Sequence, residues 1–178
     1  MQRFLDAIQT HTYTGLRDRA LAEVLCASGM RIAEALALNS EQIDWEAREA
    51  RIIGKGNKQR TIYFTDTVLE WLHRYLQLRH DTHAAVFITQ GDPPIRLRAQ
   101  GTWKRFHRYA LRAGLKKRVY PHMLRHTMAT TLLSNGCPIE ISAPYLDMNI
   151  SRRLADIISG SLQRRMSELR VQNISRMK

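Results

Sequence analysis

Four side chains of types that handle phosphate chemistry stand in a fixed order along this sequence: Arg31, Lys55, His122 and Arg125. Arginine forks hold the non-bridging oxygens of a phosphodiester as these gain negative charge in the transition state. A lysine on a turn can protonate the leaving oxygen, and a histidine can move a proton beside the nucleophile. The spacing of His122 and Arg125 places both on one face of a helix. The set is therefore a candidate site for phosphodiester transfer.

Each of these residues has a simpler interpretation when it is taken alone. Arg31 follows a helix break, where an arginine is more often an ordinary surface residue. Lys55 lies in the stretch GKGNKQ, which is also typical of a solvated turn. His122 follows a proline and can cap a helix, and His126 can be a hydrogen-bonded core histidine. The joint order and spacing of the set favour the chemical interpretation over these separate ones.

The elements that must position the arginines and the histidine are helices. Apolar residues at helical spacing predict a helix over residues 16–27, which Gly29 ends, and a second helix over residues 31–38. A further helix is predicted over residues 122–134. The positions expected to face the core of the first two helices are Leu16, Ala20, Leu21, Val24, Leu25, Ile32, Ala35 and Leu36.

A β-hairpin is predicted to carry Lys55, because short β-type runs at 50–53 and 60–64 flank the turn formers GKGNKQ. A helix capped by Thr65 or Asp66 is expected next, with Leu69, Leu72 and Leu76 facing the core. A strand at 86–89 and a loop GDPPIR follow. The last of these elements is a helix that ends at Gly114 and faces the core with Trp103, Phe106 and Ala110. The pattern predicts a mainly α domain with a small β-hairpin or short antiparallel sheet, an α+β fold rather than a doubly wound sheet.

The net charge of the chain indicates the kind of partner that it binds. The formal net charge of the 178 residues is +12 and the pI is about 10.4, so a polyanion is expected, and DNA or RNA is the first candidate. No apolar run is long enough to span a membrane, and the N-terminus lacks a secretion signal. Cys26 and Cys137 stand alone, without zinc-ligand spacing, which favours a reduced, cytoplasmic compartment and no metal.

Three stretches resemble the conserved boxes of the tyrosine recombinases, the phage-integrase family, and especially its Xer-like members. They are TGLRDRALAEVLCASGMRIAEALALNSEQID, IIGKGNKQRTIYF and YPHMLRHTMATTLLSNGC, and the resemblance runs from about residue 14 to about residue 140. It implies the family's catalytic-domain fold and double-stranded DNA as the partner. It also implies cleavage and rejoining through a 3′-phosphotyrosine, with no metal and no cofactor.

The same resemblance implies roles for individual residues. Arg31 and Arg125 would clamp the scissile phosphate, Lys55 would protonate the 5′-oxygen, and His122 would assist proton transfer. The residues expected to contact DNA are Lys55, Lys58, Arg60, Lys104 and Arg105.

The sequence departs from the family where the nucleophile should stand. The family's next box, roughly L-G-H-x-x-x-x-T-T-x-x-Y, would place its histidine at Met148 and its tyrosine at Ile157. Neither side chain can do that chemistry, and Tyr145 lies too early. Residues 1–140 are therefore expected to form an integrase-type catalytic domain without its N-terminal core-binding domain, and residues 141–178 a divergent basic tail.

A frameshift near Glu140 is one hypothesis for this tail. With suitable wobble bases, one inserted nucleotide makes ISAPYLDMNISRRLADI read HIRAILGHEHISTTGRY, which restores the histidine and the tyrosine at the two expected positions. The other hypothesis is a genuine divergent C-terminus. Apolar residues at helical spacing support it, and they are Leu154, Ile157, Ile158, Leu162, Met166 and Leu169.

The function expected from these patterns is that of a DNA-binding catalytic domain of a site-specific tyrosine recombinase, inactive as written. The alternative is a non-catalytic DNA-binding remnant that occupies or poisons recombination sites. A type IB topoisomerase relative shares the chemistry but fits the short Xer-like hairpin less well. Family members act as tetramers on two duplexes, whereas this chain is expected to be a monomer in a prokaryotic cytoplasm, associated with the nucleoid.

Overall fold

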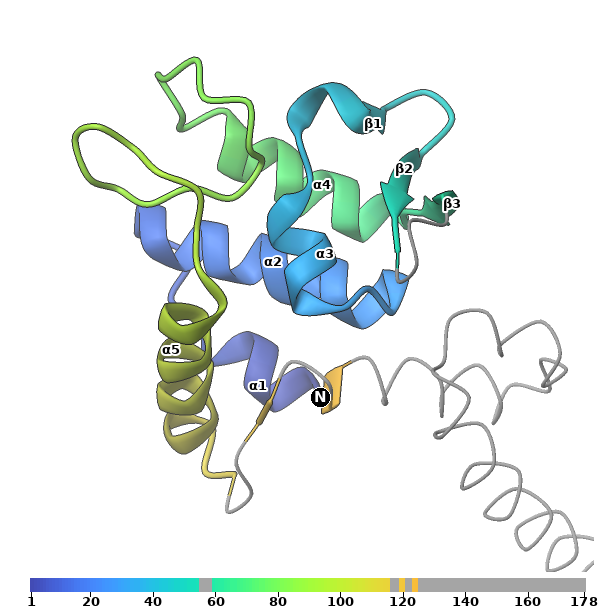
Figure 1. Ribbon diagram of the computed structural model, residues 1–178. Coiled ribbons are helices and arrows are strands. Elements are labelled where there is room, and N and C mark those ends of the chain that lie inside the picture. Colours follow the sequence, from blue (N-terminus) through green and yellow to red (C-terminus); the bar gives the residue numbers. More distant parts are fainter. Residues whose placement is uncertain (55–58, 116–118, 121–122, 125–178) are drawn as a thin grey trace, which may run out of the picture. The chain divides into compact units, whose positions relative to one another are not determined.

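This computed structural model describes residues 1–54, 59–115, 119–120 and 123–124. All described residues fall in one compact unit, Met1–Met128. Its elements in chain order are α1 (Gln2–Asp6), α2 (Tyr13–Ser28), α3 (Ile32–Ala37), the 3₁₀ helix η1 (Ser40–Gln42), β1 (Ile43–Asp44), β2 (Glu49–Ile53), β3 (Gln59–Tyr63), α4 (Asp66–Leu76) and α5 (Ala99–Arg112) (Figure 1). The predicted fold class, mainly α with a small antiparallel sheet, is confirmed.

Helix α2 is the central element, and its two ends explain its length. Thr12 accepts a hydrogen bond from the backbone N–H of Gly15 at 3.0 Å, which satisfies a donor of the first turn. Gly29 ends the helix with a left-handed φ of 61°, which a residue with a side chain adopts only with strain. The predicted core positions of this helix are all buried. Helix α2 packs against α4, and α3 follows it directly (Figure 1).

The predicted hairpin is confirmed as strands β2 and β3, and β1 adds a third antiparallel strand in the order β1-β2-β3. Alternate residues of the sheet face the core. Ala50 and Ile52 of β2 and Ile62 of β3 are buried, while Ile53 and Tyr63 are exposed. The face of each side chain in the hairpin is thus set by its register.

Two expectations about packing were wrong in detail. Thr65 caps α4 as predicted, but the buried stripe of that helix is Val68, Leu72 and Tyr75, while Leu69 and Leu76 are only partly buried. Trp103 was expected to face the core from α5, yet its side chain is 45% exposed, and Thr102, Phe106, Tyr109 and Ala110 are buried instead.

The strand expected at 86–89 is also wrong. Within the described residues the run makes one isolated bridge, between Ile88 and Arg96, and a second bridge joins its neighbour Ala85 to Asn39. Val86, Phe87 and Ile88 are buried, but the run is not assigned to a strand. Arg79 holds the preceding loop by donating to the carbonyl oxygens of Ala85 at 2.6 Å and Val86 at 3.0 Å.

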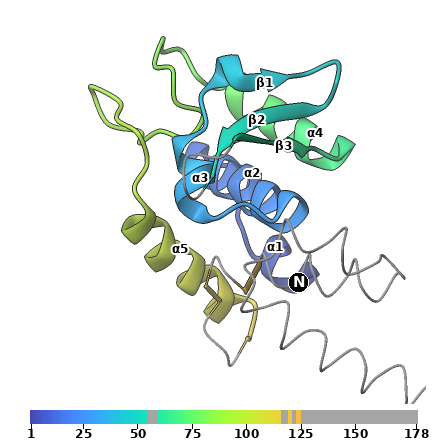
Figure 2. The same ribbon diagram turned by 45° about the vertical axis from the view of Figure 1, so that its right-hand side comes forward.

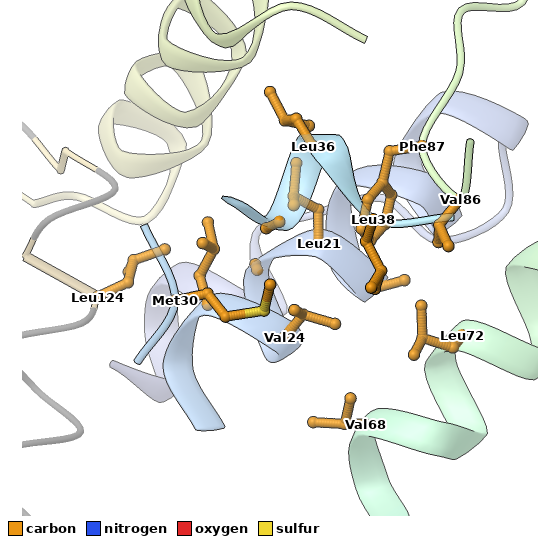
Figure 3. Packing of buried hydrophobic residues seen from close by; sticks show 14 of the residues in the cluster. Leu21, Val24, Met30, Leu36, Leu38, Val68, Leu72, Val86, Phe87 and Leu124 are labelled. Atoms are coloured by element: carbon orange, nitrogen blue, oxygen red, sulfur yellow. The ribbon is translucent and has the colours of Figure 1, made fainter. Parts of the chain in front are cut away.

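One hydrophobic core unites these elements (Figure 3). It includes Leu21 and Val24 of α2, Leu72 of α4, and Phe87 of the extended segment. Leu124 belongs to the same core and is fully buried, although it lies far along the chain. No helix in the described ranges is long and apolar enough to cross a bilayer.

Candidate phosphate-binding site

Arg31 stands at the start of α3, where the chain turns sharply after α2. The left-handed Gly29 makes that turn, and Met30 is fully buried in the core, so the backbone on which Arg31 stands is fixed. Arg31 itself is extended, with φ −68° and ψ 148°, and precedes the first helical residue. Its side chain is 32% exposed, which leaves it within reach of a ligand at the surface.

Glu34 fixes the orientation of Arg31. Its Oε1 accepts from Nη1 of Arg31 at 2.9 Å, and its Oε2 accepts from the backbone N–H of Arg31 at 2.9 Å. The backbone contact is half of a capping box, in which a side chain in the first turn satisfies the N-cap donor. Glu34 was not among the residues predicted from the sequence. A glutamate three residues after an N-cap is part of the capping-box pattern, but the N-cap residue here is Arg31 rather than the usual Ser, Thr, Asp or Asn, so only half of that signal was present.

Arg60 meets the same carboxylate from the sheet. Its Nη2 lies 2.8 Å from Oε2 of Glu34, and the side chains of Arg60 and Glu34 are 23% and 8% exposed. The expected DNA-contact residue Arg60 and the expected phosphate clamp Arg31 are thereby brought together on one buried carboxylate. The Glu34 cluster, meaning Arg31, Glu34 and Arg60, carries a net charge of +1 and is the described part of the candidate site.

Lys55, Lys58, His122, Arg125, Met148 and Ile157 lie outside the described residues. The described residues beside them still carry information. Leu124, between His122 and Arg125 in the chain, is buried in the core that also contains Met30, the neighbour of Arg31 (Figure 3). The segments that carry both expected phosphate-clamping arginines are thus anchored in the same core.

Lys104 and Arg105 both lie on α5, but their surroundings differ. Lys104 is exposed. Arg105 places Nε 2.5 Å from Oδ2 of Asp18, and Tyr109 donates to the same oxygen at 3.1 Å. Arg17 contacts the other oxygen, Oδ1, at 3.0 Å through Nη2. Asp18 is fully buried, so Arg105 has a definite role in holding α5 to α2 whatever it does towards DNA.

Three of the described tyrosines, Tyr63, Tyr75 and Tyr109, show no sign of an activated nucleophile. Burial raises the pKa of Tyr75, whose hydroxyl also accepts from the backbone N–H of Ile88. Burial and the adjacent Asp18 carboxylate raise the pKa of Tyr109 to about 12. A raised pKa keeps the phenol neutral and therefore weakly nucleophilic. Tyr63 is exposed but stands on the outer face of β3, away from Glu34.

A second chemical group, the thiol of Cys26, is equally unsuited. Burial raises its pKa to about 12, so it is a neutral thiol near pH 7. It contacts the sulfur of Met1 at 3.8 Å and packs against the core.

A hollow of about 680 Å³ beside the sheet has the wrong charge for a phosphate. It is lined by the carboxylates of Glu41, Asp44, Glu46 and Glu49, with Arg51 as the basic side chain among them. A polyanion would be repelled there. This hollow is therefore no candidate for the phosphate site.

Comparisons with known proteins were consistent across sequence and structure. The model of the phage integrase family matches residues 1–148. A tyrosine recombinase XerD of Staphylococcus epidermidis is 38% identical over 131 residues, which are 70% of this chain and 44% of that protein. A tyrosine recombinase XerC of Chlamydia muridarum is 36% identical over 132 residues, 71% of this chain and 41% of that protein. The chain thus spans less than half the length of these curated relatives.

Solved structures give the same result. The crystal structure of XerA recombinase superposes with a TM-score of 0.72 at 26% identity and covers 82% of this chain and 51% of that chain. The post-cleavage complex of XerH site-specific recombinase with palindromic difH substrate superposes with a TM-score of 0.71 at 27% identity. It covers 85% of this chain and 46% of that one.

Proposed function

This chain belongs to the phage integrase family of tyrosine recombinases, and from that membership we propose that it is the phosphate-clamping part of a site-specific recombinase, binding double-stranded DNA without cutting it. Arg31 and Arg125 clamp the scissile phosphate. Lys55 is the acid for the 5′-oxygen, and His122 assists proton transfer. The group that would attack is absent from the sequence as written, because Met148 and Ile157 stand at the expected histidine and tyrosine positions.

The observation that supports this proposal best is the shared core of the two clamp segments. Met30 and Leu124 are both fully buried in one hydrophobic cluster, and each is the chain neighbour of an expected clamp arginine. Interiors are close-packed, so the backbone at Met30 and the backbone at Leu124 are held in a fixed relation. We propose that the two arginines next to them in the chain bind one phosphate through paired, charge-assisted hydrogen bonds.

The Glu34 cluster adds the electrostatic part of the proposal. An arginine that binds an anion needs a partner that fixes its orientation, but the site around it must keep a net positive charge. Glu34 orients Arg31 through Nη1 and is itself shared with Arg60, so the cluster keeps a net positive charge. Electrostatic stabilisation from such preorganised groups is usually the largest single contribution to this type of catalysis.

Binding without cleavage follows from the nucleophile. In the family's chemistry the tyrosine oxygen displaces the 5′-oxygen and forms a phosphotyrosine. Tyr75 and Tyr109 are buried with raised pKa values, and Tyr63 lies on the outer face of β3, so none of the three replaces the missing group. The chain as written would bind a scissile phosphate and leave it intact, which is also the behaviour of a remnant that occupies or poisons recombination sites. A monomer in the cytoplasm, associated with DNA, fits this role.

A trapping experiment tests the proposal. The full chain is incubated with nicked duplexes of randomised sequence, which make cleavage irreversible, and analysed for covalent protein–DNA adducts and for binding. We expect salt-sensitive binding and no adduct. A covalent adduct would contradict the proposal that the chain lacks a nucleophile. The absence of any binding would contradict the proposed phosphate clamp.

A second version of the chain separates the two hypotheses for its tail. The gene is altered by one inserted nucleotide before codon 141, and the product is supplied with a core-binding domain from a relative. We expect this product to form the covalent adduct, whereas the double variant Met148→His, Ile157→Tyr does not, because its surrounding backbone is unchanged. If the reframed chain forms no adduct, the tail is a genuine divergent C-terminus.

A further inference from the structure

The inference concerns Arg60 and rests on the proposed function of Arg31. In the sequence, Arg60 stands beside the turn GKGNKQ among other basic residues, and it was therefore expected to contact DNA. In the fold it occupies a different kind of position, near the turn end of β3, where it forms an ion pair with Glu34 of α3. Figure 2 shows the hairpin and α3.

The register of the hairpin explains why Arg60 points to α3. Arg60 of β3 pairs with Ile52 of β2, and Ile52 is 4% exposed. Directly opposed residues of two antiparallel strands project from the same face of the sheet. The next inward residue along β3, Ile62, is fully buried. Arg60 therefore lies on the core-facing side of the hairpin, whereas Arg51 and Tyr63 lie on its outer side.

Glu34, the partner of Arg60, also forms an ion pair with Arg31. Oε1 of Glu34 accepts from Nη1 of Arg31, and Oε2 accepts both from the backbone N–H of Arg31 and from Nη2 of Arg60. One carboxylate thus joins the start of α3 to the turn end of the hairpin. Because Glu34 is 8% exposed, solvent screens this joint far less than an ordinary surface ion pair.

Sharing Glu34 also changes what Arg31 can do. A carboxylate held by one arginine alone neutralises that arginine, and a neutralised arginine attracts a phosphate weakly. A second arginine on the same carboxylate returns one net positive charge to the site. Arg60 thereby supports anion binding at Arg31 without needing to touch the anion.

We propose that Arg60 is a positioning residue: its ion pair with Glu34 anchors the β2–β3 hairpin to α3 and maintains the charge and orientation of Arg31. The hairpin that carries Lys55 and the helix start that carries Arg31 then behave as one unit. Loss of Arg60 loosens the hairpin and weakens phosphate binding through Arg31.

The variants follow from this geometry. Arg60→Gln removes the charge, and Arg60→Lys keeps it. Arg51→Gln is the matched control, since it makes the same charge change on the neighbouring strand at an exposed position of the outer face. Glu34→Gln and Arg31→Ala provide the backgrounds in which the coupling is measured.

The first readout needs no DNA. Hydrogen–deuterium exchange of the β2 and β3 amides is followed in the full chain. We expect Arg60→Gln to speed this exchange by about tenfold, the size of one charge-assisted hydrogen bond. Arg60→Lys should restore part of the protection, and Arg51→Gln should leave it unchanged. In the Glu34→Gln background, Arg60→Gln should add little, because the partner is already lost. If Arg60→Gln leaves the exchange rates unchanged, Arg60 does not anchor the hairpin to α3.

The second readout is affinity for a short double-stranded DNA of arbitrary sequence, measured over a range of salt concentrations. We expect Arg60→Gln to lower affinity severalfold, to leave the salt slope unchanged, and to have little effect in the Arg31→Ala background. A direct phosphate contact predicts the opposite: a slope smaller by about one and an effect that adds to that of Arg31→Ala. That result would overturn the positioning role. If the unchanged chain binds no DNA, the proposed function fails, and so does the proposed coupling of Arg60 to phosphate binding. The exchange experiment still tests separately whether Arg60 anchors the hairpin to α3.

Discussion

Replacing Arg105 with methionine should destabilise the fold in the absence of any DNA. Methionine keeps an apolar stem of similar length but removes the guanidinium from the oxygen of Asp18, 2.5 Å away. Asp18 is fully buried, so it cannot recover the lost bond from water. It keeps its contacts to Arg17 and to the hydroxyl of Tyr109, which limits the damage.

The magnitude follows from these contacts. A hydrogen bond to a buried charged group contributes about 1.5–3 kcal/mol, and the two remaining partners place the loss near the middle of that range, at about 2 kcal/mol. For a unit of this size, that loss lowers the melting temperature by about 6 °C. The side chain of Arg105 is only 18% exposed, so solvent replaces little of the missing interaction.

The assay is thermal unfolding of the full chain without DNA, with Lys104→Met as the control. Lys104 lies beside Arg105 on α5 but is exposed, so its replacement should leave the melting temperature unchanged. Equal melting temperatures for the two variants would refute the reasoning. The salt dependence of DNA binding then decides separately whether either residue also contacts a phosphate, because each such contact contributes about one to the slope.

Further perturbations test other parts of the structure. Gly15→Ala should destabilise the chain by about 2 kcal/mol in denaturant titrations, because the added Cβ would overlap the backbone carbonyl of Gln9. Alkylation of Cys26 at pH 8, followed by peptide mass spectrometry, should be slow in the native chain and fast in denaturant. Its thiol, with a pKa raised to about 12, forms little thiolate when folded. For the same reason stability should fall as the pH rises above the ordinary thiol value of 9.0, since only the unfolded chain then ionises. Arg31→Ala should weaken DNA binding in a fluorescence anisotropy titration, whereas Lys55→Ala should change it little in a chain that cannot cut; equal losses would contradict the assigned roles.

The sequence predicted the local architecture well because local signals determine it. Thr12, Gly29 and Thr65 act at helix ends through their own backbone geometry or a single hydroxyl, and their effects are readable from residue type. The hairpin was predictable because turn formers separate two β-type runs. The strand expected at 86–89 failed because an apolar run indicates burial and does not reveal whether a neighbouring strand is available to pair.

The partners of the basic side chains could not be predicted, since they depend on contacts between distant segments. Arg60 and Glu34 are 26 residues apart, and Arg105 and Asp18 are 87 apart. No pattern within a helix or a strand indicates such pairs. The family boxes predicted a role for Arg31 and a DNA contact for Arg60, but only the fold revealed that Glu34 links these two side chains.

These arginine contacts also affect how many of the positive charges behind the net charge of +12 are available to bind DNA. Arg17 donates to the carbonyl oxygen of Ile88 as well as to Asp18, and Arg96 donates to the carbonyl of Leu36 at 2.8 Å. Both arginines hold the backbone through these bonds, and the charge of Arg17 is already partly compensated by Asp18 before any DNA approaches. The number of phosphates that the chain neutralises should therefore be well below its formal charge. A salt titration of DNA binding measures that number directly. A slope close to the full formal charge would mean that Arg17 and Arg96 also face the DNA, which the burial of Arg17 opposes.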